Sequence, residues 1–201
     1  GTIEGAILSS VVPPLNTTIL RAVEKVLGKK PLLVGSGMKT GLNILMDNPK
    51  TVGSDMIVDA VAAIHEYPKP LIIIDMGTAT TMSVVDRAGN YCGGVILPGL
   101  KVSLDSLSGK TAQLPFISLE TPGKAIGKNT IDCMRSGIVY GNAAQIDGLI
   151  GRLEEELGEE TYEIIAAPAE VLERCEAYLV LPMETRKLYN DLWTELGIKG
   201  G

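Results

Sequence analysis

One stretch of the sequence combines a carboxylate, a glycine and three hydroxyl groups: Asp75-Met-Gly-Thr-Ala-Thr-Thr81. It follows the fully apolar residues 71–74, which predict a buried strand with the acid at its end. Such a segment suits a phosphate, because Gly77 lets backbone N–H groups approach an anion and Asp75 can hold the accompanying cation. The hydroxyls that can donate to the anion are those of Thr78, Thr80 and Thr81. A tight hairpin turn in which Asp75 caps its own backbone explains the same residues equally well.

A second group, Gly53-Ser-Asp-Met56, stands at the expected start of a helix. Asp55, if desolvated in a cleft, could act as a general base that accepts a proton from an attacking hydroxyl. A carboxylate in a first helical turn also stabilises the helix dipole, and this structural interpretation is the commoner one. A third group, Gly127-Lys-Asn-Thr130, places hydroxyl and amide groups at another helix start, where capping explains them without a ligand.

The composition excludes several kinds of chemistry. The 201 residues are 45% hydrophobic and 21% charged, which predicts a globular protein with one or two cores. A net charge of -6, the lack of a basic cluster and only 4% aromatic residues argue against nucleic-acid binding. Because His65 is the single histidine, metal clusters built on several histidines are excluded. A Ser-His-Asp triad could use only this residue.

The sequence also predicts a compartment. Cys92, Cys133 and Cys175 are odd in number and have no C-x-x-C spacing, which indicates reduced thiols in a cytoplasm. The longest apolar runs, such as residues 71–74, are too short to cross a bilayer, and the N-terminus lacks the layout of an export signal. We therefore expect a cytoplasmic protein with no membrane contact.

The elements that must position these groups begin with a strand, a helix and a strand. Residues 6–12 predict a buried strand that ends at Pro13-Pro14, residues 15–27 a helix capped by Gly28, and residues 32–34 a second strand. Residues 35–53 are rich in Gly, Pro, Asn and Asp, which predicts a long functional loop. A helix should follow with Ser54 as its N-cap. Its expected core face is Ile57, Val58, Val61, Ala62 and Ile64.

The rest of the sequence predicts an antiparallel meander followed by alternating helices and strands. This order of elements is typical of the α/β class with a mixed sheet. The meander strands are residues 71–74, 82–85 and 91–97. Later elements are a helix at 100–107, a loop at 121–128, a long helix from Asn129 or Thr130 to Gly158, strands at 162–166 and 178–181, and helices at 170–175 and 184–196. The long helix should bury Ile131, Met134, Ile138, Ile146, Leu149, Ile150, Leu153 and Leu157. Residues 68–70 are the expected domain boundary.

Taken in order, these segments resemble type III pantothenate kinase, the bacterial enzyme of the actin and sugar-kinase superfamily that phosphorylates pantothenate in coenzyme A synthesis. The resemblance covers roughly residues 5 to 157. Its motifs are Ser9-Ser-Val-Val-Pro-Pro14, Lys39-Thr-Gly-Leu42, Asp47-Asn-Pro49, Gly53-Ser-Asp55, Asp75-Met-Gly-Thr-Ala-Thr-Thr81, Gly93-Gly-Val-Ile-Leu-Pro-Gly99, Thr111-Ala-Gln-Leu-Pro115 and Gly127-Lys-Asn-Thr130.

The resemblance implies an actin-like, ribonuclease H-like fold: a mixed sheet flanked by helices, in two subdomains of which the first is truncated. Residues 1–69 would be the remainder of the N-terminal subdomain with the pantothenate loop. Residues 70–201 would be the C-terminal subdomain with the phosphate hairpin and the dimer helix. Three glycines, Gly137, Gly141 and Gly148, would let two copies of that helix approach closely.

The resemblance also implies roles for individual residues. Asp55 would be the general base on the pantothenate hydroxyl, and Asp75 would coordinate a monovalent cation, potassium or ammonium. ATP, with magnesium, would contact Gly77, Thr78 and Thr80. The residues implied to line the pantothenate site are Gly53, Ser54, Asp55, Met56 and Met46, with Thr130 reaching it across a homodimer interface.

Three departures from the family pattern keep a second interpretation open. The chain begins after the place of the family's Asp-x-Gly-Asn-Thr phosphate element, and Ala166-Ala-Pro168 stands where Thr-Gly-Gly is usual. Met46 replaces a frequent aromatic residue, and Met56 replaces an Arg that could pair with the substrate carboxylate. The alternative is a catalytically inactive relative that retains the fold for ligand binding, dimerisation or regulation.

Overall fold

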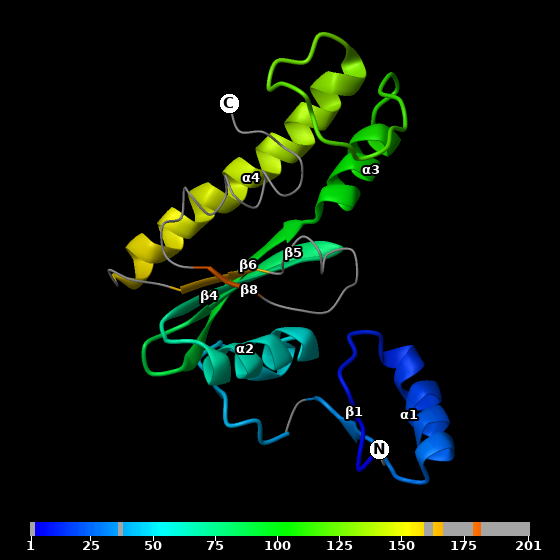
Figure 1. The fold of residues 1–201 in the computed structure, drawn as a ribbon, viewed down its shortest axis with the longest axis vertical. Coiled ribbons are helices and arrows are strands. Elements are labelled where there is room, and N and C mark those ends of the chain that lie inside the picture. The colour runs from blue at the N-terminus through cyan, green and yellow to red at the C-terminus, as the bar shows by residue number, and fades with distance from the viewer. Residues whose placement is uncertain (1–2, 36–37, 159–162, 167–178, 182–201) are drawn as a thin grey trace.

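The computed structural model describes residues 3–35, 38–158, 163–166 and 179–181. At its centre lies a mixed sheet of six strands in the order β3-β6-β5-β4-β7-β8. Helix α2 (Ser54–Glu66) covers one face of this sheet and helix α4 (Thr130–Leu157) covers the other (Figure 1). The predicted α/β class with a mixed sheet flanked by helices is confirmed.

The antiparallel meander predicted from the sequence is present. Strands β4 (Leu71–Met76), β5 (Ala79–Val85) and β6 (Asn90–Pro98) pair in sequence order. Strand β7 (Glu163–Ala166) runs parallel to β4, and β8 (Leu179–Leu181) runs antiparallel to β7. The short strand β3 (Asn43–Ile44) lies parallel to β6 at the other edge. Each meander strand extends slightly beyond its predicted limits.

Alternate residues of β4 enter two separate cores, because successive side chains of a strand point to opposite faces. Leu71 and Ile73 pack toward α2, whereas Ile72 and Ile74 pack toward α4. The α2 core is completed by Ala60, Ala63, Val85 and Tyr91, and the α4 core by Met82, Ile146, Ile150 and Ile164. The apolar run therefore fixes β4 between the two helices and places Asp75 on the α2 side of the sheet.

Helix α2 differs from the prediction in its first turn and in its buried face. Gly53, and not Ser54, is the N-cap, and Ser54 is the first helical residue. The buried apolar residues are Ile57, Ala60 and Ala63, while Val58 is 39% exposed. The predicted face was wrong at Val58 and Ala62, because the buried positions 57, 60 and 63 recur about once per turn and leave these two residues on the exposed side.

Helix α4 confirms the predicted caps. The Asn129 side chain accepts a hydrogen bond from the amide of Asp132, and Gly158 ends the helix in the left-handed conformation. Met134, Ile146 and Ile150 are buried as expected. Ile131 is 40% exposed, so the prediction that it is buried was wrong. Helix α3 (Leu100–Lys110) packs beside α4 and also confirms its prediction.

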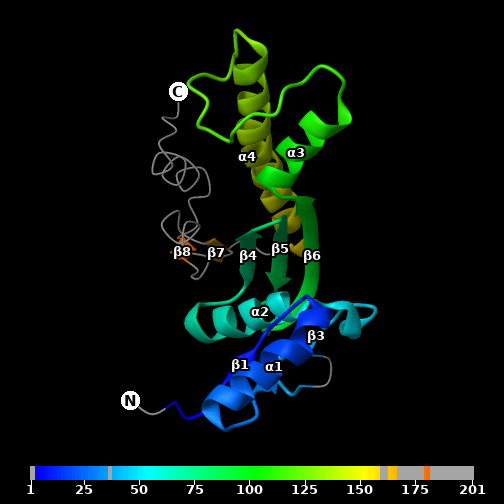
Figure 2. The same ribbon diagram turned by 90° about the vertical axis from the view of Figure 1, so that its right-hand side faces the viewer.

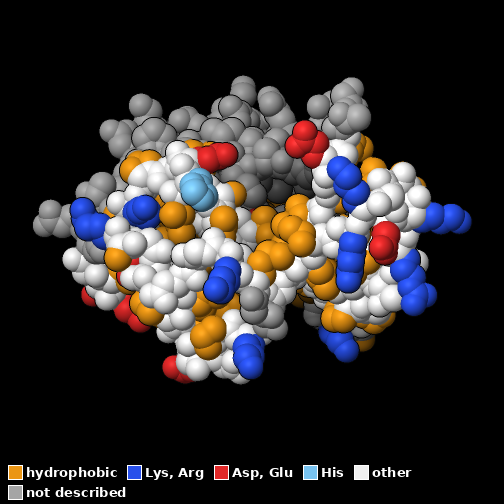
Figure 3. Space-filling model, turned by 90° about the horizontal axis from the view of Figure 1, so that it is seen from below, with side chains coloured by type: hydrophobic (Ala, Val, Ile, Leu, Met, Phe, Trp, Pro, Cys, Tyr) orange, Lys and Arg blue, Asp and Glu red, His pale blue; other side chains and the backbone are white. Residues whose placement is uncertain are grey.

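A smaller unit precedes the sheet. Strand β1 (Ile7–Leu8) pairs in parallel with β2 (Leu32–Leu33), and helix α1 (Pro13–Leu27), capped by Gly28, connects them. The strand predicted at residues 6–12 is confirmed only over Ile7–Leu8, and its predicted burial was wrong, since Ile7 is 64% exposed. Helix α1 also has no buried residue. The reason is that this two-strand sheet packs against few described neighbours. Figure 3 shows hydrophobic side chains at the surface on the side where this unit and α2 lie.

The long predicted loop at residues 35–53 contains β3 and a 3-10 turn, Pro49–Thr51, within its described part. Because β3 and α2 contact the central sheet, residues 43–66 lie with the larger unit, and the division at residues 68–70 stays a prediction. The helices predicted at 170–175 and 184–196 lie outside the described residues. Among the described residues, none of the helices has the length and apolar character needed to span a membrane.

Candidate functional site

Two carboxylates meet where β4 ends beside the start of α2. Asp75 pairs with Thr81 of β5 on the sheet face that α2 covers, and Asp55 is an exposed residue of the first turn of α2. Burial raises the pKa of the Asp75 carboxyl above its ordinary value, and the charge of the Asp55 carboxylate raises it further. Two residues 20 positions apart in sequence thus share one electrostatic environment, as a site that binds a cation or moves a proton requires.

The first turn of α2 holds the Asp55 carboxylate in place. Its Oδ1 atom accepts a hydrogen bond of 2.9 Å from the backbone N–H of Met56. A Cβ atom at position 53 would collide with this carboxylate, so the close approach requires Gly53. The positive end of the helix dipole also favours a negative charge at this position. Asp55 is therefore exposed and oriented.

A series of side-chain contacts that was not predicted from the sequence connects this turn to the sheet. The Met56 sulfur lies 3.9 Å from the Tyr91 hydroxyl, which lies 3.3 Å from Oγ of Ser83. Burial raises the pKa of Tyr91, the hydrogen bond with Ser83 opposes this rise, and the charges of Asp55 and Asp59 add to it. The pattern had indicated Tyr91 only as a strand residue. Met56 consequently packs against the sheet, where Tyr91 holds it.

The predicted phosphate segment is a hairpin with a two-residue turn, Gly77-Thr78. The N–H of Gly77 donates to the carbonyl of Ala79 at 3.0 Å, and the N–H of Gly99 donates to the carbonyl of Thr78 at 3.0 Å. A Cβ atom on Gly99 would overlap the carbonyl oxygens of both turn residues. The start of α3 therefore locks the turn, and the exposed side chain of Thr78 is left facing solvent.

Thr80 lies in a different environment from Thr78. It is 1% exposed and on the α4 side of the sheet, and its Oγ1 atom has no hydrogen-bond partner among the described residues. Thr81 lies on the Asp75 side instead. Of the three hydroxyls predicted for an anion, the structure exposes that of Thr78 and buries that of Thr80.

Met46 borders strand β6, and Thr130 lies away from the carboxylate pair. The Met46 sulfur would lie 3.0 Å from a Cβ atom on Gly93 of β6, where φ is +117°. Thr130 is the exposed first residue of α4, at the end of that helix far from α2 (Figures 1 and 2). Because α4 has 28 residues, it is about 42 Å long. Within one chain, Thr130 and Asp55 belong to opposite ends of the molecule.

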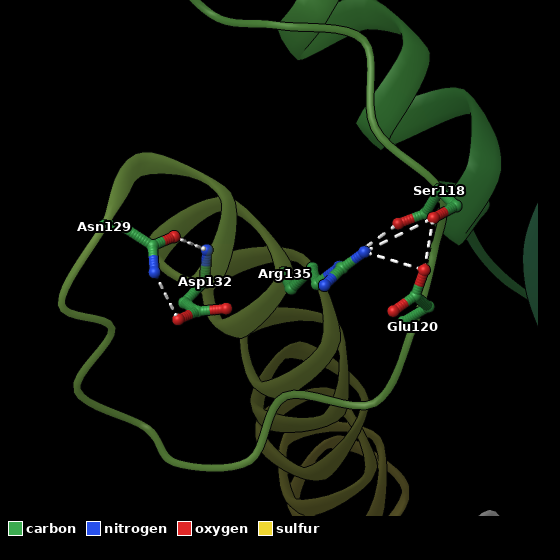
Figure 4. A network of polar contacts seen from close by, with 5 residues as sticks. All are labelled: Ser118, Glu120, Asn129, Asp132 and Arg135. Carbon is green, nitrogen blue, oxygen red and sulfur yellow. Dashed lines mark hydrogen bonds and ion pairs between the residues drawn. The ribbon is translucent and has the colours of Figure 1, made fainter.

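A polar network fixes the segment that leads to Thr130 (Figure 4). The Arg135 guanidinium lies 2.8 Å from the Glu120 carboxylate and donates to Oγ of Ser118 at 3.3 Å. One turn earlier, Asn129 Nδ2 donates to the Asp132 carboxylate at 2.6 Å. The loop at residues 121–128 is therefore tied to α4 on both sides, and the helix start is held in a defined place.

The donor set at the carboxylate pair suits hard cations and phosphate, which prefer oxygen ligands and hydroxyl donors. Within the ranges that the structure describes, there is no group of three or more His, Cys, Asp or Glu residues that could hold a metal ion. The arrangement can provide a base, a carboxylate for a cation and a hydroxyl for an anion, all near one edge of the sheet.

Comparison of the sequence with known proteins identifies one family. A family model described as type III pantothenate kinase matches residues 1–152. A type III pantothenate kinase from an Exiguobacterium species (strain AT1b) is 44% identical over 186 residues, covering 89% of this chain and 73% of that protein.

A solved structure, described as a conserved member of the Baf family of transcriptional activators from Campylobacter jejuni, has a similar fold. Its TM-score is 0.50 at 17% identity, and the match covers 74% of this chain and 65% of that chain, just under two thirds. This likeness concerns the fold alone. The family model and the 44% identical relative together confirm the resemblance drawn from the sequence: the chain belongs to the type III pantothenate kinase family.

Proposed function

We propose that this protein transfers the terminal phosphoryl group of ATP to the primary hydroxyl of pantothenate, forming 4′-phosphopantothenate in the cytoplasm. Family membership supports the reaction, and the observation that carries the proposal is the pair Asp55 and Asp75 at one edge of the sheet. Phosphoryl transfer depends mainly on positioning, charge neutralisation and a base on the acceptor. The described residues offer each of these functions without using the single histidine.

Asp55 is the general base in this proposal. Its carboxylate is exposed and held by the Met56 amide, so it can accept the proton of the pantothenate hydroxyl as the oxygen attacks phosphorus. Gly53 and Met56 would form the floor beside it, and Met46 belongs to the same proposed pantothenate site. Ser54 would border this site with its backbone only, because its hydroxyl is bonded to Ser9 and Ser10. Because Met56 packs toward Tyr91, recognition of the pantothenate carboxylate needs another group.

The hairpin binds ATP phosphate in this proposal. Thr78 donates its exposed hydroxyl, Gly77 permits a close approach, and the buried Thr80 would reach phosphate only after the turn rearranges. Asp75 would hold a monovalent cation, potassium or ammonium, while magnesium would accompany ATP. When bound, these cations neutralise phosphate charge. A cation beside Asp75 would also favour its ionised form, against the effects of burial and Asp55.

The proposal includes a homodimer of actin-like subunits in which Thr130 of the partner subunit completes the pantothenate site. Two observations support it: Thr130 is exposed at the end of α4 remote from Asp55, and Cβ atoms at three α4 glycines would meet nothing within 4 Å. Those glycines are Gly137, Gly141 and Gly148. Nucleic acid and membrane are not among the proposed partners.

An inactive relative is the second candidate, and one observation favours it. The Gly77 amide already donates to Ala79, so the hairpin offers one donor fewer to phosphate. Calorimetry with ATP and potassium separates the candidates, because tight, cation-dependent ATP binding is expected only of the kinase.

The test of the proposed function is a turnover assay on the whole protein with ATP, magnesium, pantothenate and potassium. Asp55→Asn should lower kcat by about 100-fold or more, because a positioned base contributes that much. Asp105→Asn makes the same chemical change at an exposed aspartate of α3 and should leave kcat unchanged. Equal turnover by Asp55→Asn and wild type would exclude Asp55 as the base.

A further inference from the structure

The hydroxyl of Ser54 makes three hydrogen bonds to a segment distant in sequence. Its Oγ atom accepts from the Ser10 amide at 3.2 Å and from the Ser9 hydroxyl at 3.2 Å, and it donates to the Ser10 carbonyl at 3.0 Å. Ser54 itself is only 9% exposed. A serine hydroxyl has one proton to donate and two lone pairs to accept with. All of its capacity is therefore used, and none is left for capping α2 or for binding a substrate.

These bonds join two parts of the molecule. Ser9 and Ser10 follow β1 in the small N-terminal unit, 45 and 44 positions before Ser54. The Val11 side chain would lie 3.8 Å from a Cβ atom on Gly53, so the same segment also borders the residue before Ser54. Figures 1 and 2 show the chain after β1 reaching α2. The contact is thus a joint between the β1–α1 unit and the turn that carries Asp55.

We propose that Ser54 is a positioning residue: its hydroxyl fixes the first turn of α2, and with it Asp55, to the segment Ser9–Ser10. This rests on the proposed function only in naming Asp55 as the base. Because Ser54 and Asp55 are consecutive residues of one turn, loosening the joint displaces the carboxylate. Small displacements of a catalytic group lower rates strongly, since the reacting atoms must be held in near-attack geometry. The hydroxyl acts through Asp55 and does not touch pantothenate.

The joint is tested first without turnover, by hydrogen exchange of the Ser10 amide in the whole protein. Ser54→Ala removes the acceptor of that amide and should speed its exchange about tenfold, the effect of losing one hydrogen bond. Ser10→Ala is the matched control, because the Ser10 hydroxyl contacts the Val12 amide while its backbone atoms contact Ser54. It should leave the exchange of this amide within about twofold of wild type. Unchanged exchange in Ser54→Ala would overturn the proposal.

Kinetics then separate a joint from a substrate contact. Ser54→Ala should lower kcat about tenfold and Ser9→Ala about threefold, with the double variant no worse than Ser54→Ala, since both act on one set of hydrogen bonds. A rise in KM for pantothenate in Ser54→Ala alone, with Ser9→Ala like wild type, would identify a direct contact and overturn the proposal. Ser9→Ala removes one bond only, so it stays informative where Ser54→Ala does not fold. An inactive wild type would refute the proposed function, and the exchange experiment would still decide the joint.

Discussion

Asp55 and Asp75 lie close enough for the charge of the first carboxylate to raise the pKa of the second. Burial of Asp75 at the end of β4 is the larger cause, and Asp55 adds to it from the first turn of α2. Like charges are brought together only where the fold holds both residues firmly, because each disfavours ionisation of the other. The proximity of the two carboxylates is therefore electrostatically unfavourable, and a bound cation would relieve this repulsion.

The pH dependence of stability follows from this pair. Because folding raises the pKa of Asp75, its contribution to stability is full below the ordinary pKa of about 3.9 and is lost as pH rises through the folded value. The Asp75→Asn side chain cannot ionise, so the free energy of unfolding of this variant should rise relative to wild type as pH increases above about 4. The gain should stay below about 1 kcal/mol, because the group is only half-buried and solvent screens it.

Denaturant unfolding at several pH values measures this gain. Asp55→Asn is the companion variant: without the Asp55 charge, the pKa of Asp75 falls, and the loss of stability moves to lower pH. A difference between Asp75→Asn and wild type that is constant with pH would contradict the raised pKa.

Gly99→Ala should destabilise the hairpin. The added Cβ atom would lie 2.7 Å from the Thr78 carbonyl oxygen and would overlap that of Gly77, so the turn or the start of α3 must move. Overpacking of this kind lowers the free energy of unfolding by about 1–3 kcal/mol. Gly109→Ala is the control in the same helix, since its Cβ atom meets nothing within 4 Å. It should be neutral or stabilise by up to about 1 kcal/mol, and equal losses in both variants would refute the role of Gly99.

Thr78 and Thr80 should differ in their effect on ATP affinity. Thr78→Val removes an exposed hydroxyl at the turn and should raise KM for ATP about tenfold, the effect of one hydrogen bond to a charged group. Thr80→Val replaces a buried, unpaired hydroxyl by a methyl group of similar size, so KM for ATP should stay within about twofold. Steady-state kinetics with varied ATP measure both, and the reverse order would place Thr80 in the phosphate site.

Arg135→Ala should loosen the loop before α4. It removes an ion pair with Glu120 and two hydrogen bonds to Ser118 from a side chain that is 20% exposed. The free energy of unfolding should fall by about 1–2 kcal/mol. Lys101→Ala breaks a looser pair with Asp105 at 3.9 Å, where the lysine is 86% exposed, and should change stability by less than about 0.5 kcal/mol. Thermal unfolding compares the two, and a larger loss in Lys101→Ala would contradict this assignment.

The elements that were predictable carry their signals within a few residues. Asn129 and Gly158 mark the ends of α4 by local hydrogen bonding and by a left-handed backbone, and both caps were predicted. The strands predicted at residues 71–74, 82–85 and 91–97 formed the meander as expected, because strand pairing across a short turn needs no distant information. The same holds for Asp75, whose place at a strand end follows from the run before it.

The features that were not predicted depend on contacts between residues distant in sequence. The spacing of residues along the chain does not reveal such contacts. Ser54 has the residue type of an N-cap, yet Ser9 and Ser10 take its hydroxyl. Nothing in the sequence around Met56 indicates that Tyr91 lies beside its sulfur. The exposure of Ile7 likewise depends on which neighbours cover β1, a property of the assembled fold.

The alternation along β4 has a consequence for folding. A slip of this strand by one residue would exchange its two sets of apolar side chains, and the cores would hardly distinguish the two arrangements, since all four residues are Leu or Ile. Asp75 does distinguish them, because the slip would turn its carboxylate toward the apolar contacts of α4, where an unpaired charge is strongly disfavoured. The residue proposed to hold a cation thereby also acts as a register mark, selecting the one alignment of the sheet in which the site can exist.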